Sequence, residues 1–585
     1  MFRSNHRHVQ PGLFDTIQQL PKKVGQRLDD SWAGTFYREV FCRIDERPFA
    51  VLYADEPSRP NTPVNVLVGL EVIKAGFGWS DEELYDAFLF NLQVRYALGL
   101  WDIGSGNFEL RTLYNFRRRL SQHMQETGEN LLERVFAQVT DEQLAALKLK
   151  TGQQRMDSTL VASNIRQTSR LQLLVEVLQR VWLMLDEGDQ ADYAELFTPY
   201  RQGSAGQYCY RVRGQEVPVH LEAIGHLTQR LVVELAANYR DHPGYRVLQR
   251  VFEEHFVLEE AGKSAEKPGK VRVKAESELS AASLQSPDDW EATFREKGGK
   301  GHRGYVANVA ETCDPGNPVQ LITQVQVAPN VTDDEELLVE GLPDLKERTD
   351  LDTLWTDGGY NGPEAGVAMQ EHQVTHIPTA IRGGQPASDR LGLDAFSWET
   401  DEAGVPRSVT CPGEQRVALR PGRKAGRHLA YFDQTACQGC PLLDQCPTRR
   451  QKRRPLRVLR LTTRQAQVAQ LRQRSAQARG PGNLRAAAES TVRSLKHPFG
   501  GQAGKLPVRG QARVTMVIIG SALMVNLRRI WRYERESRRR EGQERRTSLS
   551  LLASLLTRWW QRLETLADRW HAHLFPTLVP TLAKV

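Results

Sequence analysis

The stretch "TLWTDGGYNG" at residues 353–362 constrains the fold of this chain more than any other segment. A short apolar run ends at Asp357, and Gly358 and Gly359 follow at once, so the pattern predicts a strand with an acidic last residue. The two glycines allow the backbone to leave the strand without obstructing the space beside the carboxylate. Ligands gather at the carboxyl ends of parallel strands, and we therefore expect Asp357 to lie at a functional site.

The segments around this stretch predict a mixed sheet. "LKLKTGQQRMDSTLVA" predicts a strand that carries Asp157. Two later β runs, "HRGYVANVAET" and "VQLITQVQVA", are separated by "CDPGNP", which favours an antiparallel hairpin. A helix around "DEELLVEGLPDLKER" leads to the Asp357 strand, and a helix at 364–372 leads to a strand in "VTHIPTA". This order predicts an α/β fold with helices on the faces of a sheet, in which Asp157 lies beside Asp357.

A third acidic group is predicted on a helix near the end of the sheet-forming region. Glu489, in "NLRAAAESTVRSLKHPFGG", is the only carboxylate between Asp444 and Glu534. Arg485, Glu489 and Lys496 follow the pattern R-x3-E-x6-K, which places them within one broad helical face. The alternative interpretation is that Glu489 is an ordinary salt-bridge partner in a basic helix.

Other acidic residues compete for the same role. The four consecutive acids that begin the predicted helix after the hairpin suit a helix N-terminus, where the helix dipole stabilises negative charge. We therefore interpret them as structural; they are Asp333, Asp334, Glu335 and Glu336. Asp289 precedes the hairpin. Its role is left open, and one alternative is that it positions the metal ligands without binding the metal itself.

These motifs together resemble those of a known enzyme family. "RMDSTLVASNI", "TDGGYNGPE" and the R-x3-E-x6-K helix are similar to the three acidic motifs of DDE transposases from bacterial insertion sequences. "SPDDWEATFREKGGKGHRGY" and "SWAGTFYREVF…RPNTPVNVLVGL" resemble the large, cysteine-containing branch of that superfamily, and the resemblance spans roughly residues 30–530. The family often has tyrosine three residues before the arginine, where this chain has Gly482. The resemblance implies a ribonuclease H-like core that cleaves transposon ends and joins them to target DNA.

The chemistry of phosphodiester cleavage agrees with these acidic residues. Two divalent ions about 3.5–4 Å apart can activate a nucleophile and stabilise the leaving oxygen, and Mg²⁺ prefers oxygen ligands such as carboxylates. We expect Asp157, Asp357 and Glu489 to be catalytic residues that bind two Mg²⁺ or Mn²⁺ ions. Arg485 and Lys496 are expected to hold DNA phosphates near the scissile bond.

The charge distribution also predicts a DNA partner. The net charge is +7, and the stretch between Asp444 and Glu489 holds twelve Lys and Arg but no acid. Such tracts meet phosphate backbones, although a merely solvated basic face is the alternative. In this tract Arg453 and Arg454 are candidate DNA contacts. Arg117 and Arg118 are further candidates, on a predicted helix whose apolar face could equally belong to an ordinary amphipathic helix.

Four of the seven cysteines form a cluster in the sequence. Cys411, Cys437, Cys440 and Cys446 supply one C-x2-C pair and two further thiols, which suits a structural tetrahedral Zn²⁺ ion. Reduced thiols without metal and a redox role are the alternatives, whereas disulfides are not expected in a cytosolic protein. No apolar core of a secretory signal is visible in "MFRSNHRHVQPGLFD". The apolar run from Val514 has about thirteen residues, fewer than the roughly twenty of a membrane span, so we expect a buried helix, a cytoplasmic protein and no membrane partner.

The predicted organisation has five parts. They are a helical N-terminal DNA-binding domain (1–150), a ribonuclease H-like catalytic core (151–170, 286–384 and 481–530), a helical insert with a linker (171–285), a cysteine-containing basic insert (385–480) and a helical C-terminal tail (531–585). In the tail, the helical spacing around Trp559 and Trp560 fits either dimerisation or core packing.

The predicted function is a transposase that binds the terminal inverted repeats of its own insertion sequence, cleaves them and joins the 3′-OH ends to target DNA. Bringing two ends together requires more than one protomer, so we expect a homodimer on double-stranded DNA. Two alternatives remain open. One is a nuclease of the same fold without strand transfer, and the other is a non-catalytic DNA-binding relic or regulator of the element.

Overall fold

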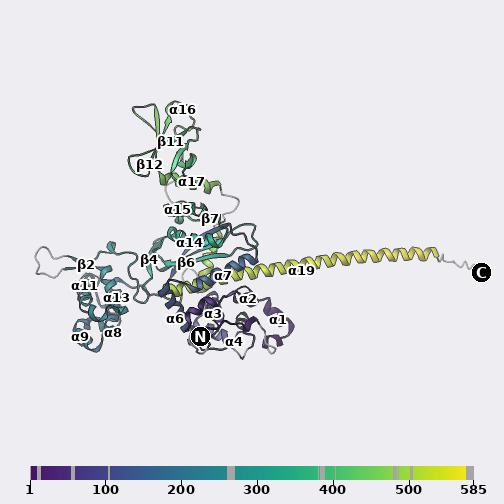
Figure 1. The fold of residues 1–585 in the computed structure, drawn as a ribbon, viewed down its shortest axis with the longest axis horizontal. Coiled ribbons are helices and arrows are strands. Elements are labelled where there is room, and N and C mark those ends of the chain that lie inside the picture. The colour runs from purple at the N-terminus through teal and green to yellow at the C-terminus, as the bar shows by residue number, and fades with distance from the viewer. Residues whose placement is uncertain are drawn as a thin grey trace, which may run out of the picture.

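The structure is a computed structural model that describes residues 2–9, 15–54, 60–102, 104, 106–259, 270–379, 381, 389–401, 404–477, 484, 486–500 and 505–574. It is a mixed α/β protein in which a central body carries three projections (Figure 1). A helical insert leaves the body on one side, a β-rich insert leaves it at the top of Figure 1, and one long helix extends away opposite the helical insert.

The N-terminal part of the chain is helical, as the sequence predicts. Its helices are α1 (Lys22–Asp29), α2 (Trp32–Glu39), α3 (Val64–Phe77), α4 (Asp81–Phe90), α5 (Leu92–Ala97), α6 (Leu110–Thr127) and α7 (Leu131–Ala146). A capping box begins α4, because the side chains of Ser80 and Glu83 each accept the other residue's backbone N–H. Most of α3 is buried, and it packs against the long helix α19 (Gln511–Leu574).

The central sheet has the predicted order of elements. Its strands are β1 (Gln153–Ala162), β4 (Thr293–Lys297), β5 (Lys300–Thr312), β6 (Ile322–Pro329), β7 (Thr353–Thr356) and β8 (Thr375–Pro378). β5 and β6 form the predicted antiparallel hairpin. β1 pairs antiparallel with β5 and parallel with β7, and β7 pairs parallel with β8. The strands therefore run β6-β5-β1-β7-β8 across the sheet, with β4 beside the first half of β5.

Helices cover both faces of this sheet. On one face α14 (Asp334–Arg348) and α15 (Pro363–Glu371) form a core with Met156, Ala310 and Leu354. On the other face α18 (Ala486–Lys496), α19 and the N-terminal helices form the largest core, which contains Val161 and Val309. The connections β6–α14–β7 and β7–α15–β8 confirm the predicted alternation of strand and helix.

The helical insert contains more elements than the sequence suggested. Its helices are α8 (Arg170–Met184), α9 (Glu187–Arg201), α10 (Ala205–Arg211), α11 (Val217–Glu234), α12 (Ala236–Tyr239) and α13 (Pro243–His255). The predicted helical character of residues 171–285 is confirmed for most of this segment. The insert also contains a small antiparallel sheet that was not predicted, in which β2 (Phe256–Glu259) follows α13 directly and pairs with β3 (Lys270–Val273). Phe256 and Val271 bury their side chains in the core of this insert.

The cysteine-containing insert forms an antiparallel sheet that its sequence did not reveal. Its strands are β9 (Ser397–Thr400), β10 (Pro406–Thr410), β11 (Arg416–Pro421), β12 (Arg427–Asp433), β13 (Arg449–Arg450) and β14 (Leu456–Thr462), in the order β13-β14-β12-β11-β10-β9. The short helix α16 (Gln434–Gln438) follows β12, and α17 (Thr463–Gln477) packs beneath the sheet near β9. One face of the sheet is buried around Phe396, Phe432 and Leu459.

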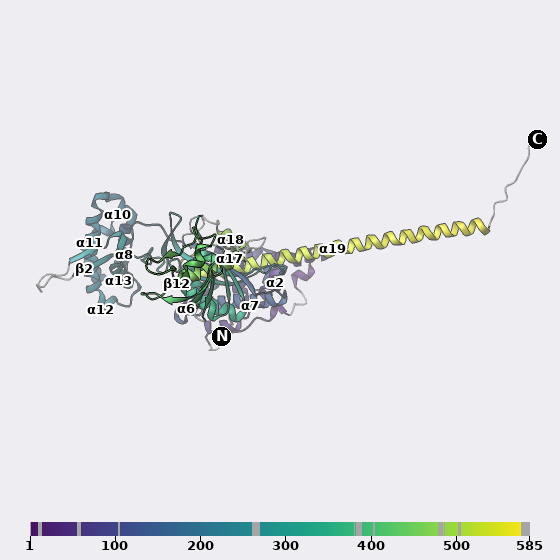
Figure 2. The ribbon, with the colours of Figure 1, turned by 90° about the horizontal axis from the view of Figure 1, so that it is seen from above.

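Helix α19 has a buried half and an exposed half. The apolar run from Val514 is buried in the largest core, which confirms the prediction of a buried helix. By length and composition alone residues 511–544 pass as a membrane span, but 78% of their most apolar window is buried inside the protein. Beyond this part α19 extends away from the body (Figures 1 and 2). Trp559 and Trp560 are 66% and 65% exposed there, so the core-packing interpretation of these residues is wrong.

Candidate active site

The register between β1 and β7 places Asp157 and Asp357 side by side. The last paired residues of these parallel strands are Arg155 and Trp355, and each aspartate lies two residues further on. Asp357 keeps an extended backbone, with φ −87° and ψ −177°. The two carboxylates therefore leave the same face of adjacent strands, which are about 4.8 Å apart. The prediction that these strands bring the two aspartates together agrees with this register.

The backbone turns at Asp357 because the next residues form a tight 3-10 turn (Gly358–Tyr360). The Gly359 N–H donates to Asp357 Oδ1 at 2.6 Å and holds this carboxylate at the end of the strand. A Cβ atom on Gly359 would lie 2.4 Å from Asp334 Oδ2 and 2.9 Å from Asp357 Oδ1. Gly359 is therefore required for the space around the carboxylates, and neither it nor Gly358 has a left-handed φ.

Asp334 is an acidic residue that the sequence did not assign to this site. It is the first residue of α14 and is 8% exposed. Its Oδ1 accepts a hydrogen bond from Ser158 Oγ at 2.6 Å, and its Oδ2 faces Gly359. Asp334 thus lies in the first turn of its helix, as the sequence predicts, and also joins α14 to β1 beside the candidate site. Its neighbour Glu335 instead accepts the backbone N–H groups of Glu364 and Ala365, and so caps α15.

The raised pKa of Tyr360 reflects its burial and the negative charge of the carboxylates near the end of β7. Its hydroxyl donates to Asn308 Oδ1 at 2.6 Å, beneath β1. Burial raises the pKa of Tyr360 well above its usual value, and the carboxylates of Asp334, Asp157 and Asp357 raise it further. The phenol is thus neutral, and three carboxylates lie close enough to act on it.

Helix α18 runs along β1 on the face that carries Asp157. Side chains alternate along a strand, so Arg155, Asp157 and Thr159 point to the same side. At the start of the helix Arg155 Nη1 donates to the Leu484 carbonyl at 2.5 Å, and at its end Lys496 Nζ donates to Thr159 Oγ1 at 2.7 Å. The helix and the strand therefore run in the same direction, with Asp157 between the two contacts.

The position of Lys496 also locates Glu489. Two turns separate them, so they share one side of the helix, about 10 Å apart along its axis. Lys496 contacts Thr159, and about 10 Å along β1 corresponds to roughly three residues before Thr159. Glu489 therefore lies near the level of Asp157. Its side chain is exposed. Within the described ranges no three His, Cys, Asp or Glu side chains converge closely enough to hold a metal ion, so the three predicted acids are neighbours that are not gathered around one point.

A buried ionic network fixes α18 and α19 to the sheet. Glu311, on β5, is 1% exposed. Its carboxylate accepts hydrogen bonds from Arg155 Nε at 2.6 Å, from Arg529 Nη1 at 2.6 Å and from Thr491 Oγ1 at 2.8 Å. These donors come from β1, α19 and α18. Glu311 therefore determines where the helix that carries Glu489 lies against the strand that carries Asp157.

Asp289 belongs to a second buried network. Its carboxylate accepts hydrogen bonds from Ser163 Oγ and Tyr305 Oη, both at 2.5 Å, and from the Gly510 N–H at 3.0 Å. These contacts join the end of β1 to β5 and to the start of α19, so Asp289 has a structural role.

The predicted DNA contacts differ in their availability. Arg485, with Gly482, lies outside the described residues. Lys496 Nζ is bonded to β1, and burial, followed by the charge of Lys297, lowers its pKa. Arg117 pairs with Glu71 at 2.7 Å and with Asp81 at 2.8 Å, and its side chain is 15% exposed. Its prediction as a DNA contact is therefore wrong, because those carboxylates already occupy its guanidinium group.

The remaining predicted arginines are accessible. Arg118 is exposed on α6, and Arg453 and Arg454 are exposed in the turn between β13 and β14. Next to that turn, the open face of the insert sheet displays a group of exposed arginines that we call the basic face. They are Arg416, Arg420, Arg427, Arg449 and Arg460.

Cross-strand register explains why these arginines share one face. Arg420 on β11 pairs with Leu429 on β12, and Leu429 pairs with Arg460 on β14. Arg449 on β13 pairs with Val458, which lies two residues before Arg460 on β14 and therefore points to the same face. Apolar residues at alternate positions fill the opposite, buried face. The Arg420 guanidinium lies over the Tyr431 ring at 5.6 Å, so it covers the aromatic surface. Arg416 pairs with Glu399 at the edge of the sheet.

The four clustered cysteines lie in the same insert, with Cys437 on α16 at the end of the insert away from the body (Figure 1). Cys411, Cys437 and Cys446 contribute to its core. A Cβ atom on Gly413 would lie 3.3 Å from Cys440 Sγ and 3.8 Å from Cys411 Sγ. Burial raises the pKa of the Cys437 thiol, and the Cys446 and Cys411 thiols raise it further. The thiols are grouped, but in the described part of the chain they do not form a ready metal site.

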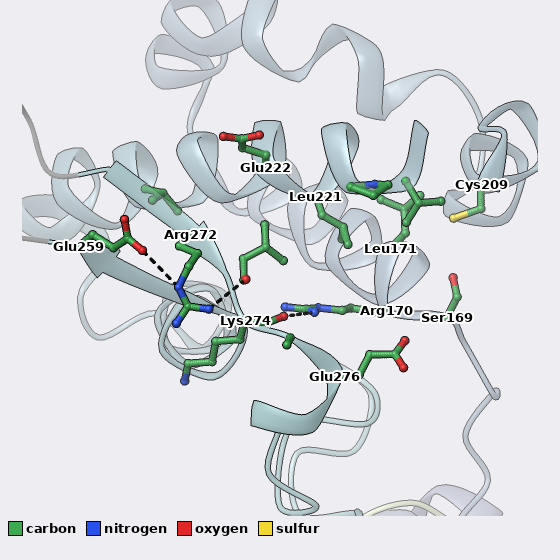
Figure 3. A pocket seen from close by; sticks show the side chains of 15 residues that line it. Ser169, Arg170, Leu171, Cys209, Leu221, Glu222, Glu259, Arg272, Lys274 and Glu276 are labelled. Atoms are coloured by element: carbon green, nitrogen blue, oxygen red, sulfur yellow. Dashed lines mark hydrogen bonds and ion pairs between the residues drawn. The ribbon is translucent and has the colours of Figure 1, made fainter. Parts of the chain in front are cut away.

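A cavity in the helical insert lies away from the acidic residues. It has a volume of about 800 Å³ and lies in the helical insert between α8, α11 and β3 (Figure 3). Arg170 crosses it and donates to the backbone carbonyls of Lys274 and His255, each at 2.7 Å. Its lining comes from the insert and none of it from β1 or β7, so this cavity is no part of the candidate active site.

Comparison with known proteins gives one match, to a family model that covers part of the chain. Residues 410–531 match a family model described as a transposase DDE domain. The matched segment contains Glu489, Lys496, the four clustered cysteines and the basic face, whereas Asp157 and Asp357 precede it. Searches of curated proteins and of solved structures gave no match. The family match supports a DDE-type transposase.

Proposed function

We propose, from the transposase DDE domain in residues 410–531, that this chain cleaves the DNA ends of its own element and joins them to target DNA. The observation that carries the proposal is the register that sets Asp157 beside Asp357, with α18 and Glu489 along the same strand. We also propose that the core is ribonuclease H-like. The strand order β6-β5-β1-β7-β8, with only β5 antiparallel to β1, β7 and β8, supports this assignment.

The donors at this site fit Mg²⁺ or Mn²⁺, since they are carboxylate oxygens. Asp157 and Asp357 would hold the ions together with Glu489 once the latter closes on the strand. When bound, two such ions activate the attacking oxygen and stabilise the leaving oxygen. The protein contributes the fixed positions: the Gly359 N–H orients Asp357, and Ser158 joins β1 to Asp334.

The proposal is tested with purified protein and labelled ends of its own element. We expect cleavage in Mg²⁺ or Mn²⁺ and none in EDTA, followed by joined products when target DNA is added. A pre-cut end that is never joined would show a nuclease without strand transfer. Binding to the ends that leaves them intact with either ion would show a DNA-binding relic or regulator.

We propose that the basic face binds the phosphate backbone of duplex DNA. Arg420, Arg427 and Arg460 are exposed, and no described carboxylate forms an ion pair with them. Because Arg420 covers the Tyr431 ring, the face offers charge and no free aromatic platform for stacking a base. Such a surface binds DNA of any sequence, and its affinity falls steeply with salt.

Replacing Arg420, Arg427 and Arg460 together with glutamine is expected to weaken duplex binding. Log affinity falls with log salt concentration, and each lost phosphate contact reduces the magnitude of this negative slope by about 0.9. The triple variant should therefore show a slope whose magnitude is smaller by roughly 2 to 3. Fluorescence anisotropy over a salt series measures this slope. As a matched pair, Arg420→Gln is compared with Arg407→Gln, since Arg407 is 71% exposed and pairs with Asp401. An unchanged slope in the triple variant would reject the basic face as a DNA contact, whether or not the ends are cleaved.

We propose that the four clustered cysteines bind one structural Zn²⁺ ion, for which thiolates are suitable ligands. Their grouping around Gly413 and the core of the insert supports this proposal. Metal analysis of purified protein is expected to give about one zinc per chain, and Cys437→Ser and Cys440→Ser are expected to abolish it. Cys209→Ser in the helical insert is the control. Wild-type protein with less than about half a zinc per chain would contradict the assignment.

A further inference from the structure

The far half of α19 carries a continuous apolar stripe that no other described part of the chain covers. This stripe, which we call the α19 seam, consists of large side chains that are each at least 43% exposed. They are Leu551, Leu552, Leu555, Leu556, Trp559, Trp560, Leu563, Leu566 and Trp570. Figures 1 and 2 show this half of the helix extending away from the body in both views.

The exposed area of the α19 seam exceeds what a lone soluble chain normally presents. Its tryptophans are each about two-thirds exposed, and aromatic side chains have about 150–250 Å² to bury. The three tryptophans alone therefore expose several hundred Å², and six leucines add to them. Patches of this size mark an interaction surface. It is also of the order that each partner contributes to a stable interface, about 800 Å².

The spacing of the seam indicates what covers it. From Leu552 to Trp570 the central residues recur at alternating intervals of four and three, through Leu556, Trp559, Leu563 and Leu566. This is the repeat of a coiled coil, in which apolar residues every 3.5 positions form a seam along two helices. A second copy of the same helix carries the same repeat, so a symmetric pair satisfies both seams at once.

We infer that two copies of this chain associate through the α19 seam, without DNA. Leu555 and Trp560 flank the central positions and widen the buried strip. The opposite side of the helix is polar at Thr557, Gln561 and Glu564, which stay in water. Because α19 is continuous from Gln511 to Leu574 and its first half is buried in the core, the pairing is transmitted rigidly to both catalytic bodies. This inference does not depend on the proposed function.

The test uses the full-length protein without DNA, at about 1–50 μM, in analytical ultracentrifugation. We expect a mass twice that of the 66.3 kDa chain. Leu556→Glu with Leu563→Glu places charges in the seam and is expected to raise the dimer dissociation constant at least about tenfold. Thr557→Glu with Gln561→Glu adds the same charge on the polar side and should leave it unchanged. Thermal unfolding of the control variant should match the wild type, because these side chains contact no described core. The seam variant should unfold as a folded protein, with a midpoint that is lower than that of the wild type only by the stabilisation that dimerisation supplies.

Three outcomes would overturn the inference. One is a wild-type chain that stays monomeric over this concentration range. Another is a seam variant that dimerises as well as its control. The third is a monomer that sediments with phosphatidylcholine–phosphatidylserine vesicles, which would identify a lipid surface as the occupant. A dimer that fails to cleave DNA would count only against the proposed function, so the two proposals fail separately.

Discussion

Replacing Asp157 with asparagine is expected to lower metal-dependent end cleavage by at least about a thousandfold. Asp157 is 5% exposed and lies beside Asp357 on the adjacent strand. The amide keeps the shape of the side chain but removes the charge that holds a divalent ion. Since metal ions supply several kcal/mol of transition-state stabilisation and about 1.4 kcal/mol changes a rate tenfold, a loss of this size is expected.

Single-turnover cleavage of labelled ends measures the rate, and binding in Ca²⁺ measures affinity for the same DNA. Asp352→Asn is the matched control, because Asp352 is exposed just before the start of the same strand as Asp357. It should cleave at the wild-type rate. Asp157→Asn should bind DNA within about twofold of wild type. Wild-type cleavage by Asp157→Asn would show that Asp157 is not a metal ligand, and it would contradict the proposed mechanism.

Replacing Glu311 with glutamine is expected to lower the free energy of unfolding of the core by about 3–5 kcal/mol. Glu311 is 1% exposed and neutralises both Arg155 and Arg529. Without the Glu311 charge, the buried guanidinium of Arg155 and the half-buried guanidinium of Arg529 lose their carboxylate partner. The new amide N–H₂ group also points its own donors at the donors of these arginines. The same change releases Thr491 and so loosens the helix that carries Glu489.

Urea denaturation of the full chain, followed by tryptophan fluorescence, measures the effect on stability. Glu336→Gln is the control, since Glu336 is exposed on α14 and such surface changes stay within about 0.5 kcal/mol. Thr491→Val should cost about 1–2 kcal/mol, because it removes the hydrogen bond that Thr491 donates to Glu311 and the one that it accepts from Arg529, while both groups keep other partners. A loss below about 1 kcal/mol for Glu311→Gln would contradict its assignment as the anchor of α18.

Local patterns were sufficient for the elements that carry two of the predicted acids. The segment "RMDSTLVA" predicted β1, turn residues in "CDPGNP" predicted the β5–β6 hairpin, and the apolar run before Asp357 predicted β7. The insert at 385–480 was not recognised as a sheet, although "RVALRP" and "LRVLRLT" alternate. Its strands are short, and frequent arginines conceal the apolar positions, so only the register of six strands shows that one face is buried.

Arg117 shows the limit of reasoning from charge. Three consecutive arginines on an amphipathic helix indicate either DNA or solvent, and the sequence favours neither. Glu71 and Asp81 lie 46 and 36 positions away in the sequence and meet Arg117 only when α3, α4 and α6 pack together. Asp334 shows the same limit: it begins its own helix, as the sequence predicts, but its hydrogen-bond donor, Ser158, lies 176 residues away and could not be identified from the sequence.

The sequence by itself determined the order of strands and helices in the central sheet, the positions of Asp157 in β1 and of Asp357 directly after β7, and the heptad spacing of α19, because these follow from periodicities of two to seven residues along the chain. Only the tertiary structure decided which charges are neutralised, as at Glu311 and Arg117, and which stay available, as on the basic face and the α19 seam. The packing of distant elements determines which partner a charged side chain meets. Burying that charge costs free energy unless the partner replaces the hydration that the charge loses.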